Sequence, residues 1–158
     1  MGFLEPHGRR GRADGFARLS GKRIIIHSLA DAQAALAAAE ALAVPVTLVS
    51  AEGAGGYVGA LWFKAVIETA TAKHPTFAAT AVLDCAGEAG TVLNALRHGI
   101  KRVRFAGSAA ALKRLKEIAR ACGAEIESGR RPAALDLLRE RDAAAACRRY
   151  LTAPARRR

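Results

Sequence analysis

The sequence predicts an α/β fold in which about five parallel strands alternate with helices, as a half (β/α)8 barrel or as a flavodoxin-like open sheet. The main observation is residues 80–108, where an apolar run ends in Asp84, a helical segment at 91–98 closes at a glycine, and a second β-rich run follows. The flanking segments repeat this pattern. A chain of 158 residues that is 51% hydrophobic has enough apolar material for one core. We therefore expect a single domain over residues 22–151.

The first half of the chain is expected to supply two strands, each followed by a helix. Residues 23–27 form the first strand, and Ser28 opens a capping-box pattern that starts an alanine-rich helix. Pro45 stands at the start of a second strand at residues 46–49, where proline does not interrupt a ladder. A glycine-containing loop then leads to a helix at residues 59–73.

The second half adds strands at residues 103–106 and 124–127, separated by an amphipathic helix that closes at Gly123. Residues 130–132 interrupt the pattern, and we expect a last helix over about residues 133–150. A half barrel leaves apolar surface that needs cover. We expect a homodimer to supply that cover through Leu135, Leu138 and Cys147 of this last helix.

The net charge of +11 is concentrated at the two ends of the chain. Residues 1–23 carry a balance of +4 and residues 148–158 a balance of +5, whereas residues 24–147 hold 14 basic and 12 acidic side chains. We therefore expect a disordered basic tail at residues 1–21 and a basic C-terminal tail at residues 152–158. Only 5% of residues are aromatic, which argues against stacking on nucleic-acid bases. Association with nucleic acid through the tails stays open as an alternative.

Three widely spaced cysteines without a CxxC motif indicate neither a disulfide framework nor a zinc ribbon. They fit a reducing cytoplasm, so we expect a cytoplasmic protein. The sequence also shows no apolar run long enough for a membrane span.

Polar residues follow the predicted strands at the edge where parallel α/β sheets gather functional groups. The candidates are His27, Ser50, Asp84, Cys85 and Ser108. Asp84 is either a general acid or base in a cleft or a loop aspartate that accepts backbone N–H bonds. Cys85 is either a metal ligand with His27 as its partner or a small buried hydrophobe.

The stretches SLADAQAALAAAEALAVPVTLVSAEGAGGY and AVLDCAGEAGTVLNALRHGIKRVRFAGS resemble the N-terminal half of class II, zinc-dependent fructose-bisphosphate aldolases. The likeness covers about residues 24–128. It implies part of a (β/α)8 barrel, with Asp84 at the catalytic aspartate of the family's Leu-Asp-His-Gly motif. Cys85 stands at the zinc-binding histidine of that motif, and Ser50 at a loop serine near the substrate.

The chain also departs from the aldolase pattern. Ala106 and Ala109 replace the aspartate and histidine of the family's Asp-Gly-Ser-His motif, and Gly129 stands at a metal-associated glutamate. The later barrel strands, which carry further zinc ligands and the phosphate-binding loops, have no counterpart.

These observations lead to an expected function. We expect a degenerate aldolase-like half barrel that binds a small molecule or a protein without aldolase turnover, with Asp84 as the catalytic-position residue and Ser50 and Ser108 as substrate-binding residues. The alternative is a metal-dependent carbon–carbon lyase completed across a dimer. We expect no cofactor. In the lyase alternative the metal is zinc, and Cys85 and His27 would hold it. The expected partners are a second copy or another polypeptide, and a small carbonyl compound or sugar phosphate.

Overall fold

The computed structural model describes residues 21–154, and residues 1–20 and 155–158, which make up most of the predicted basic tails, lie outside the described residues. The described part contains one sheet of six parallel strands in the order β5-β4-β3-β2-β1-β6. The strands are β1 (Lys22–Ile26), β2 (Val46–Ser50), β3 (Thr80–Asp84), β4 (Arg102–Arg104), β5 (Glu125–Glu127) and β6 (Ala134–Asp136). The helices are α2 (Leu29–Leu42), α3 (Ala54–Tyr57), α4 (Ala60–Ala72), α5 (Ala89–Arg97), α6 (Ala109–Ala121), the 3-10 turn η1 (Leu137–Arg139) and α7 (Ala143–Thr152).

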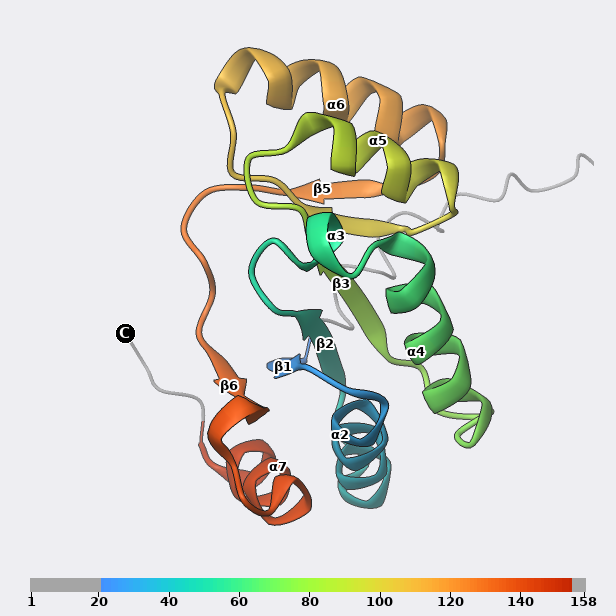
Figure 1. Ribbon diagram of the computed structural model, residues 1–158. Coiled ribbons are helices and arrows are strands. Elements are labelled where there is room, and N and C mark those ends of the chain that lie inside the picture. Colours follow the sequence, from blue (N-terminus) through green and yellow to red (C-terminus); the bar gives the residue numbers. More distant parts are fainter. Residues whose placement is uncertain (1–20, 155–158) are drawn as a thin grey trace, which may run out of the picture.

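The first five strands of the sheet are wound in one direction, as in a barrel, and β6 returns to pair with β1. Strands β1 to β5 are neighbours in chain order, and the long helices form one continuous layer in which α7 packs on α2, α2 on α4, α4 on α5 and α5 on α6 (Figure 1). Right-handed crossovers in a constant direction place all helices on the same face. Strands β5 and β6 do not pair, so the sheet is open. The predicted α/β class with parallel strands is confirmed, with six strands in place of about five.

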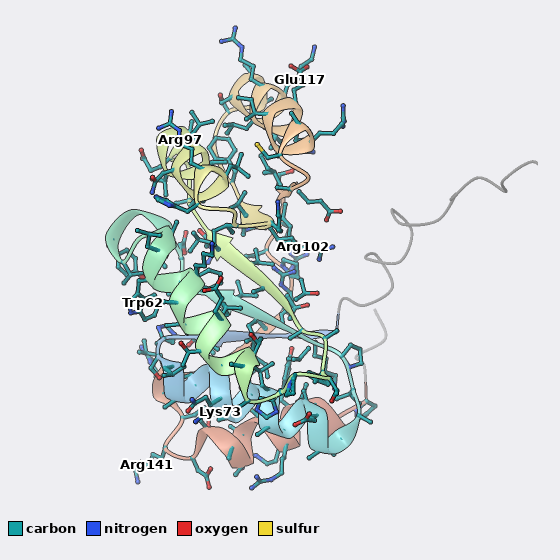
Figure 2. The ribbon with its side chains drawn as sticks, turned by 90° about the vertical axis from the view of Figure 1, so that its right-hand side faces the viewer. Trp62, Lys73, Arg97, Arg102, Glu117 and Arg141 are labelled. Carbon is teal, nitrogen blue, oxygen red and sulfur yellow. The ribbon has the colours of Figure 1, made fainter. Side chains whose placement is uncertain are left out.

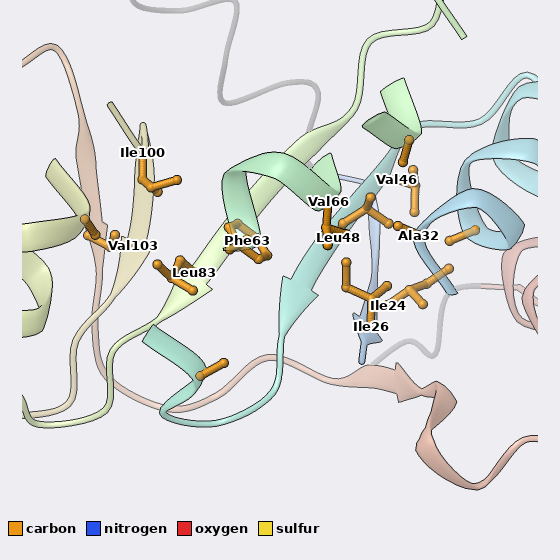
Figure 3. Packing of buried hydrophobic residues seen from close by; sticks show 14 of the residues in the cluster. Ile24, Ile26, Ala32, Val46, Leu48, Phe63, Val66, Leu83, Ile100 and Val103 are labelled. Carbon is orange, nitrogen blue, oxygen red and sulfur yellow. The ribbon is translucent and has the colours of Figure 1, made fainter. Parts of the chain in front are cut away.

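The apolar core lies between the sheet and this helix layer. Along each strand the residues of one parity point to the helices, as period-two alternation requires, and Ile24, Ile26, Val46 and Leu48 all belong to the buried cluster (Figure 3). Phe63 enters the cluster from α4. The opposite face of the strands therefore points away from the helices, and it carries the polar side chains of the candidate site.

Helix α2 packs between α7 and α4 because its buried side chains are small. Four of its five buried residues are alanine. The helix begins as predicted, since the Ser28 hydroxyl accepts a hydrogen bond from the Asp31 N–H at 3.1 Å. On α7 the facing residues, Ala146 and Cys147, are also small and fully or almost fully buried. These small side chains allow α2 and α7 to pack closely against each other.

The predicted last helix over residues 133–150 is wrong in its first part. Leu135 pairs in parallel register with Ile24, so residues 134–136 form an edge strand of the sheet. Two aspartates then cap the helical elements that follow. Asp136 accepts a hydrogen bond from the Leu138 N–H at the start of η1, and Asp142 caps α7. Strand pairing and local side-chain bonds have overridden the high helix propensity of this stretch.

Two of the three residues predicted for a dimer interface on this helix are used within the chain, and the homodimer itself stays a prediction. Cys147 is buried against α2 of the same chain, and Leu135 packs against the core, which leaves Leu138 as the exposed member of the three. The apolar side of α7 is already used within the chain.

Within residues 21–154, no helix is both long enough and apolar enough to cross a membrane.

Candidate functional site

A row of alternating charges crosses the face of the sheet that points away from the helices, here called the inner face. The row lies at the carboxyl ends of the strands. Asp84 on β3 is in register with Arg104 on β4, which is in register with Glu127 on β5. Paired residues of parallel strands point to the same face. The row therefore places a carboxylate, a guanidinium and a second carboxylate side by side, with Asp84 and Arg104 almost completely buried.

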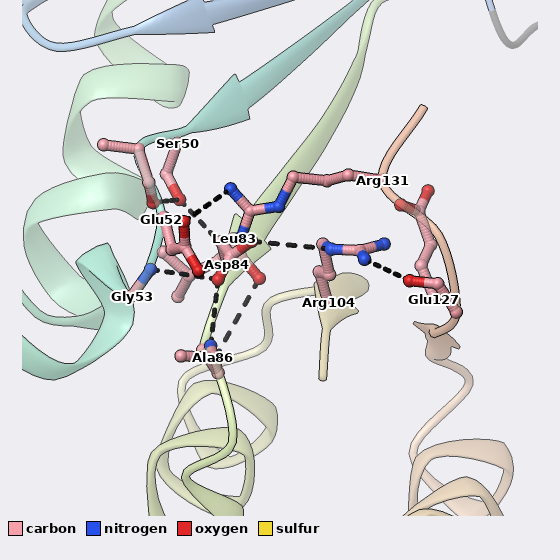
Figure 4. Close-up of polar contacts among 12 residues, drawn as sticks. Ser50, Glu52, Gly53, Leu83, Asp84, Ala86, Arg104, Glu127 and Arg131 are labelled. Carbon is pink, nitrogen blue, oxygen red and sulfur yellow. Dashed lines mark hydrogen bonds and ion pairs between the residues drawn. The ribbon is translucent and has the colours of Figure 1, made fainter. Parts of the chain in front are cut away.

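Asp84 uses both carboxylate oxygens for contacts within the chain (Figure 4). Its Oδ1 accepts hydrogen bonds from the N–H groups of Gly53 and Ala86, both at 2.9 Å. Its Oδ2 lies 2.8 Å from Nη2 of Arg131 and 3.7 Å from Nε of Arg104. Buried carboxylates are stable when paired and hydrogen-bonded in this way. Asp84 is the group that ties three loops together.

The backbone after Asp84 is held by the same carboxylate. Ala86 has a positive φ of 47°, a conformation that is unusual for a residue with a side chain. The hydrogen bond from its N–H to Asp84 forms the Asx-type turn that supports this conformation. This contact matches the loop-aspartate alternative predicted from the sequence.

The segment between β5 and β6 covers the charged row. Arg131 from this segment pairs with Asp84 and also lies 3.2 Å from the carboxylate of Glu52, while Arg104 donates to the carbonyl of Gly129 (Figure 4). A cavity of only about 20 Å³ is left beneath it. The lining residues are Arg23, Ile25, Val49, Ser50, Asp84, Arg104, Arg131, Pro132 and Ala134.

The predicted site residues other than Cys85 are divided among three places. Ser50 lies beside Asp84, because its hydroxyl accepts the Asp84 N–H at 2.8 Å. Ser108 caps α6 by accepting the Ala111 N–H. The ring nitrogen Nε2 of His27 lies 2.7 Å from Oδ1 of Asp136. The structure thus brings together Asp84 and Ser50 and assigns the other polar residues different contacts.

Cys85 lies in the apolar core. Its side chain is buried, and burial, followed by the negative charge of Asp84, raises the pKa of the thiol to about 12. Zinc binds the thiolate and not the neutral thiol. Among residues 21–154 there is no cluster of three or more His, Cys, Asp or Glu side chains arranged to hold a metal ion. The donor set around Cys85 does not fit zinc, and zinc binding by Cys85 and His27 stays a prediction without support from this geometry.

Asp136 holds His27 at the opposite edge of the sheet. Burial raises the pKa of this carboxyl, but the hydrogen bonds from the Leu138 N–H and from His27 outweigh it, so the pKa lies below its ordinary value.

Sequence reasoning missed the arginines of the site. Arg104 lies within a β-rich run for which only a strand is predicted, and Arg131 lies in a segment predicted only to interrupt the pattern. The available signal was period two: Arg104 alternates with the buried Val103 and Phe105, which places it on the face opposite to the core.

Comparison with known proteins supports the fold. No family model matches the chain, and no curated protein matches its sequence. The fold is similar to the crystal structure of a candidate fructose-1,6-bisphosphate aldolase from Coccidioides immitis, with a TM-score of 0.59 and 19% identity. The likeness covers 72% of this chain and 43% of the other, so this chain spans less than half of that neighbour. The chain has an aldolase-like fold.

Proposed function

We propose that this protein acts by binding a partner and that its aldolase-like site does not cleave substrates. The observation that carries the proposal is that both carboxylate oxygens of Asp84 are already engaged within the chain, by Gly53, Ala86 and Arg131. A general base needs a free oxygen within hydrogen-bond reach of the substrate proton. Here the carboxylate instead fixes two backbone loops and neutralises a cation.

The available space supports the same conclusion. A single water needs a cavity of about 10–15 Å³, so a volume of about 20 Å³ holds little more than one water. A sugar phosphate enters only if Arg131 leaves Asp84 and Glu52. Breaking these ion pairs is unfavourable, because Asp84 is buried and would lose a charged partner.

The test is a cleavage assay with the full chain, fructose 1,6-bisphosphate and added zinc. We expect no metal-dependent cleavage above the level of the Asp84→Asn variant. Residual activity that is equal in both proteins comes from a contaminant. Metal-dependent cleavage that is present in the wild type and lost in Asp84→Asn overturns the proposal, provided that Glu125→Gln, a control at an exposed carboxylate, retains it.

A second candidate function, binding of a polyanion such as nucleic acid, is favoured by the charge of the folded domain. Residues 85–123 hold eight basic and two acidic side chains, whereas residues 24–84 hold two basic and five acidic ones. The exposed basic residues on α5, on α6 and on the turn after α5 include Arg97, which Figure 2 labels, Lys101, Lys113, Arg114, Lys116 and Arg120. Clustered cations on one part of a fold attract phosphates.

Salt titration with a DNA duplex tests this second function. We expect binding to weaken steeply as salt rises, and each of the single variants Lys113→Glu and Lys116→Glu to bind more weakly than Lys73→Glu, at the C-cap of α4. Binding by the two α6 variants that equals the binding by Lys73→Glu removes α6 from the interface.

A further inference from the structure

The described part of the chain exposes one compact apolar patch, formed by Tyr57, Val58, Leu61 and Trp62. Their exposed fractions are 66%, 37%, 61% and 38%. They lie at the end of α3 and in the first turn of α4 (Figure 2 shows Trp62). Only two other large hydrophobic residues within 21–154 are exposed, Ile118 and Leu138, each on a different helical element.

The composition of this patch is that of a binding surface. Tyrosine and tryptophan dominate the energy of protein interfaces because they bury a large area at little entropic cost. Taken together, the four side chains expose on the order of 300 Å² of surface, which is comparable with the largest patches on soluble monomers. No charged residue occurs between Glu52 and Lys64.

Charge decides which partner fits this surface. The α5 and α6 region is strongly basic, and two copies that met there would repel each other. The α7 side is occupied by α2. The patch is neutral, and the charges that flank it are paired within the chain: Glu52 lies 3.2 Å from Arg131, and Lys64 lies 3.8 Å from Glu68. An identical neutral apolar surface can therefore meet it without an electrostatic cost.

We infer that this patch, named here the α3–α4 patch, is the interface of a homodimer with twofold symmetry. In such a dimer the same residues of both copies face one another. A stable interface needs about 800 Å² from each partner, so the contact extends beyond the four residues. The neighbouring exposed residues of α4, which are Ala65, Glu68 and Thr69, provide the continuation.

The α3–α4 patch also borders the candidate site. Gly53, whose N–H donates to Asp84, is the N-cap of α3. Packing of a second copy on α3 would restrain the loop that holds Asp84. The inference is independent of the proposed lack of turnover: a dimer that cleaves substrate overturns only the proposed function, and a monomer that does not cleave overturns only the dimer.

The test combines solution mass with substitutions of matched exposure. The full chain has a mass of 16.6 kDa, and sedimentation or light scattering should give twice this value. Leu61→Glu should raise the dimer dissociation constant at least about tenfold, as expected for a central interface residue. Leu138→Glu is the control, because Leu138 is 65% exposed and lies outside the patch.

A second variant and an intrinsic probe make the result independent of folding defects in one protein. Tyr57→Lys should dissociate the dimer as Leu61→Glu does, with unchanged circular dichroism for both. Trp62 is the single tryptophan, so its emission should shift to the red on dilution of the wild type and not on dilution of the variants. A wild type that is monomeric at every accessible concentration overturns the inference, as does a dimer that Leu61→Glu dissociates no more readily than Leu138→Glu does.

Discussion

Arg23 on β1 and Glu127 on β5 form a two-pronged ion pair, with N–O distances of 2.7 and 3.1 Å, although three strands lie between them in the sheet. In a flat sheet these strands would be about 19 Å apart. The contact therefore requires a strongly curved sheet whose inner face closes on itself. The concave interior is filled by the chain's own charges.

Removing the charge of Glu127 should destabilise the curved sheet. In Glu127→Gln the guanidinium of Arg23, which is 14% exposed, keeps its position without a counter-charge. We expect the free energy of unfolding to fall by about 2 kcal/mol, less than for a fully buried pair because water reaches both groups. Urea denaturation measures the loss.

Glu125→Gln is the matched control on the same strand. Glu125 pairs with Arg102 at 3.0 Å but is 62% exposed. Its loss should stay below about 1 kcal/mol. Equal effects of the two substitutions would show that the pair between Arg23 and Glu127 does not stabilise the closure.

Asp84→Asn should cost more stability than any exposed carboxylate. The substitution keeps the shape but leaves Arg131 and the buried Arg104 with one negative charge fewer. We expect a loss of about 3 kcal/mol or more. Asp136→Asn, at a carboxylate that is 51% exposed, should lose less than about 1 kcal/mol. A similar small loss at both positions would argue against a structural role for Asp84.

Much of the fold follows from local sequence signals. The alternation of buried and outward residues, the Ser28 cap and the glycines at Gly99 and Gly123 predict five strands and four of the helices close to their observed bounds. These signals involve residues close together in the chain, so they can be recognised in the sequence alone. The sequence did not predict strand β6, because this strand forms only by pairing with β1, more than 100 residues away.

The site was predicted only in part, for a related reason. Asp84 and Ser50 were found because both end strands, and parallel strands bring their ends together. Arg131 was not found, because no local pattern marks a loop arginine that crosses the mouth of the sheet to reach Asp84. Its role depends on curvature, which arises from the whole sheet.

Two adjacent glycines of α3 should respond in opposite ways to alanine. A Cβ at Gly55 would lie 2.8 Å from Cγ2 of Thr91 and 2.9 Å from Sγ of Cys85, closer than packed atoms tolerate. We expect Gly55→Ala to cost about 1–3 kcal/mol. A Cβ at Gly56 meets nothing within 4 Å, and Gly56→Ala should be neutral or stabilising by about 0.5 kcal/mol. Thermal unfolding of the two variants measures both effects, and destabilisation by both would contradict the open space at Gly56.

The three cysteines should differ sharply in reactivity. Cys122 is exposed, whereas burial raises the pKa of Cys85 to about 12 and that of Cys147 to about 11, so these two stay neutral in mildly alkaline buffer. A chromogenic disulfide reagent should modify one thiol of the native chain, none in Cys122→Ser, and all three after unfolding. Because an unfolded chain releases these thiol protons near the ordinary pKa of 9.0, stability should be complete below that pH and decline as the pH rises toward 11 and 12. Rapid modification of two or more native thiols would show that the layer between the sheet and its helices opens readily.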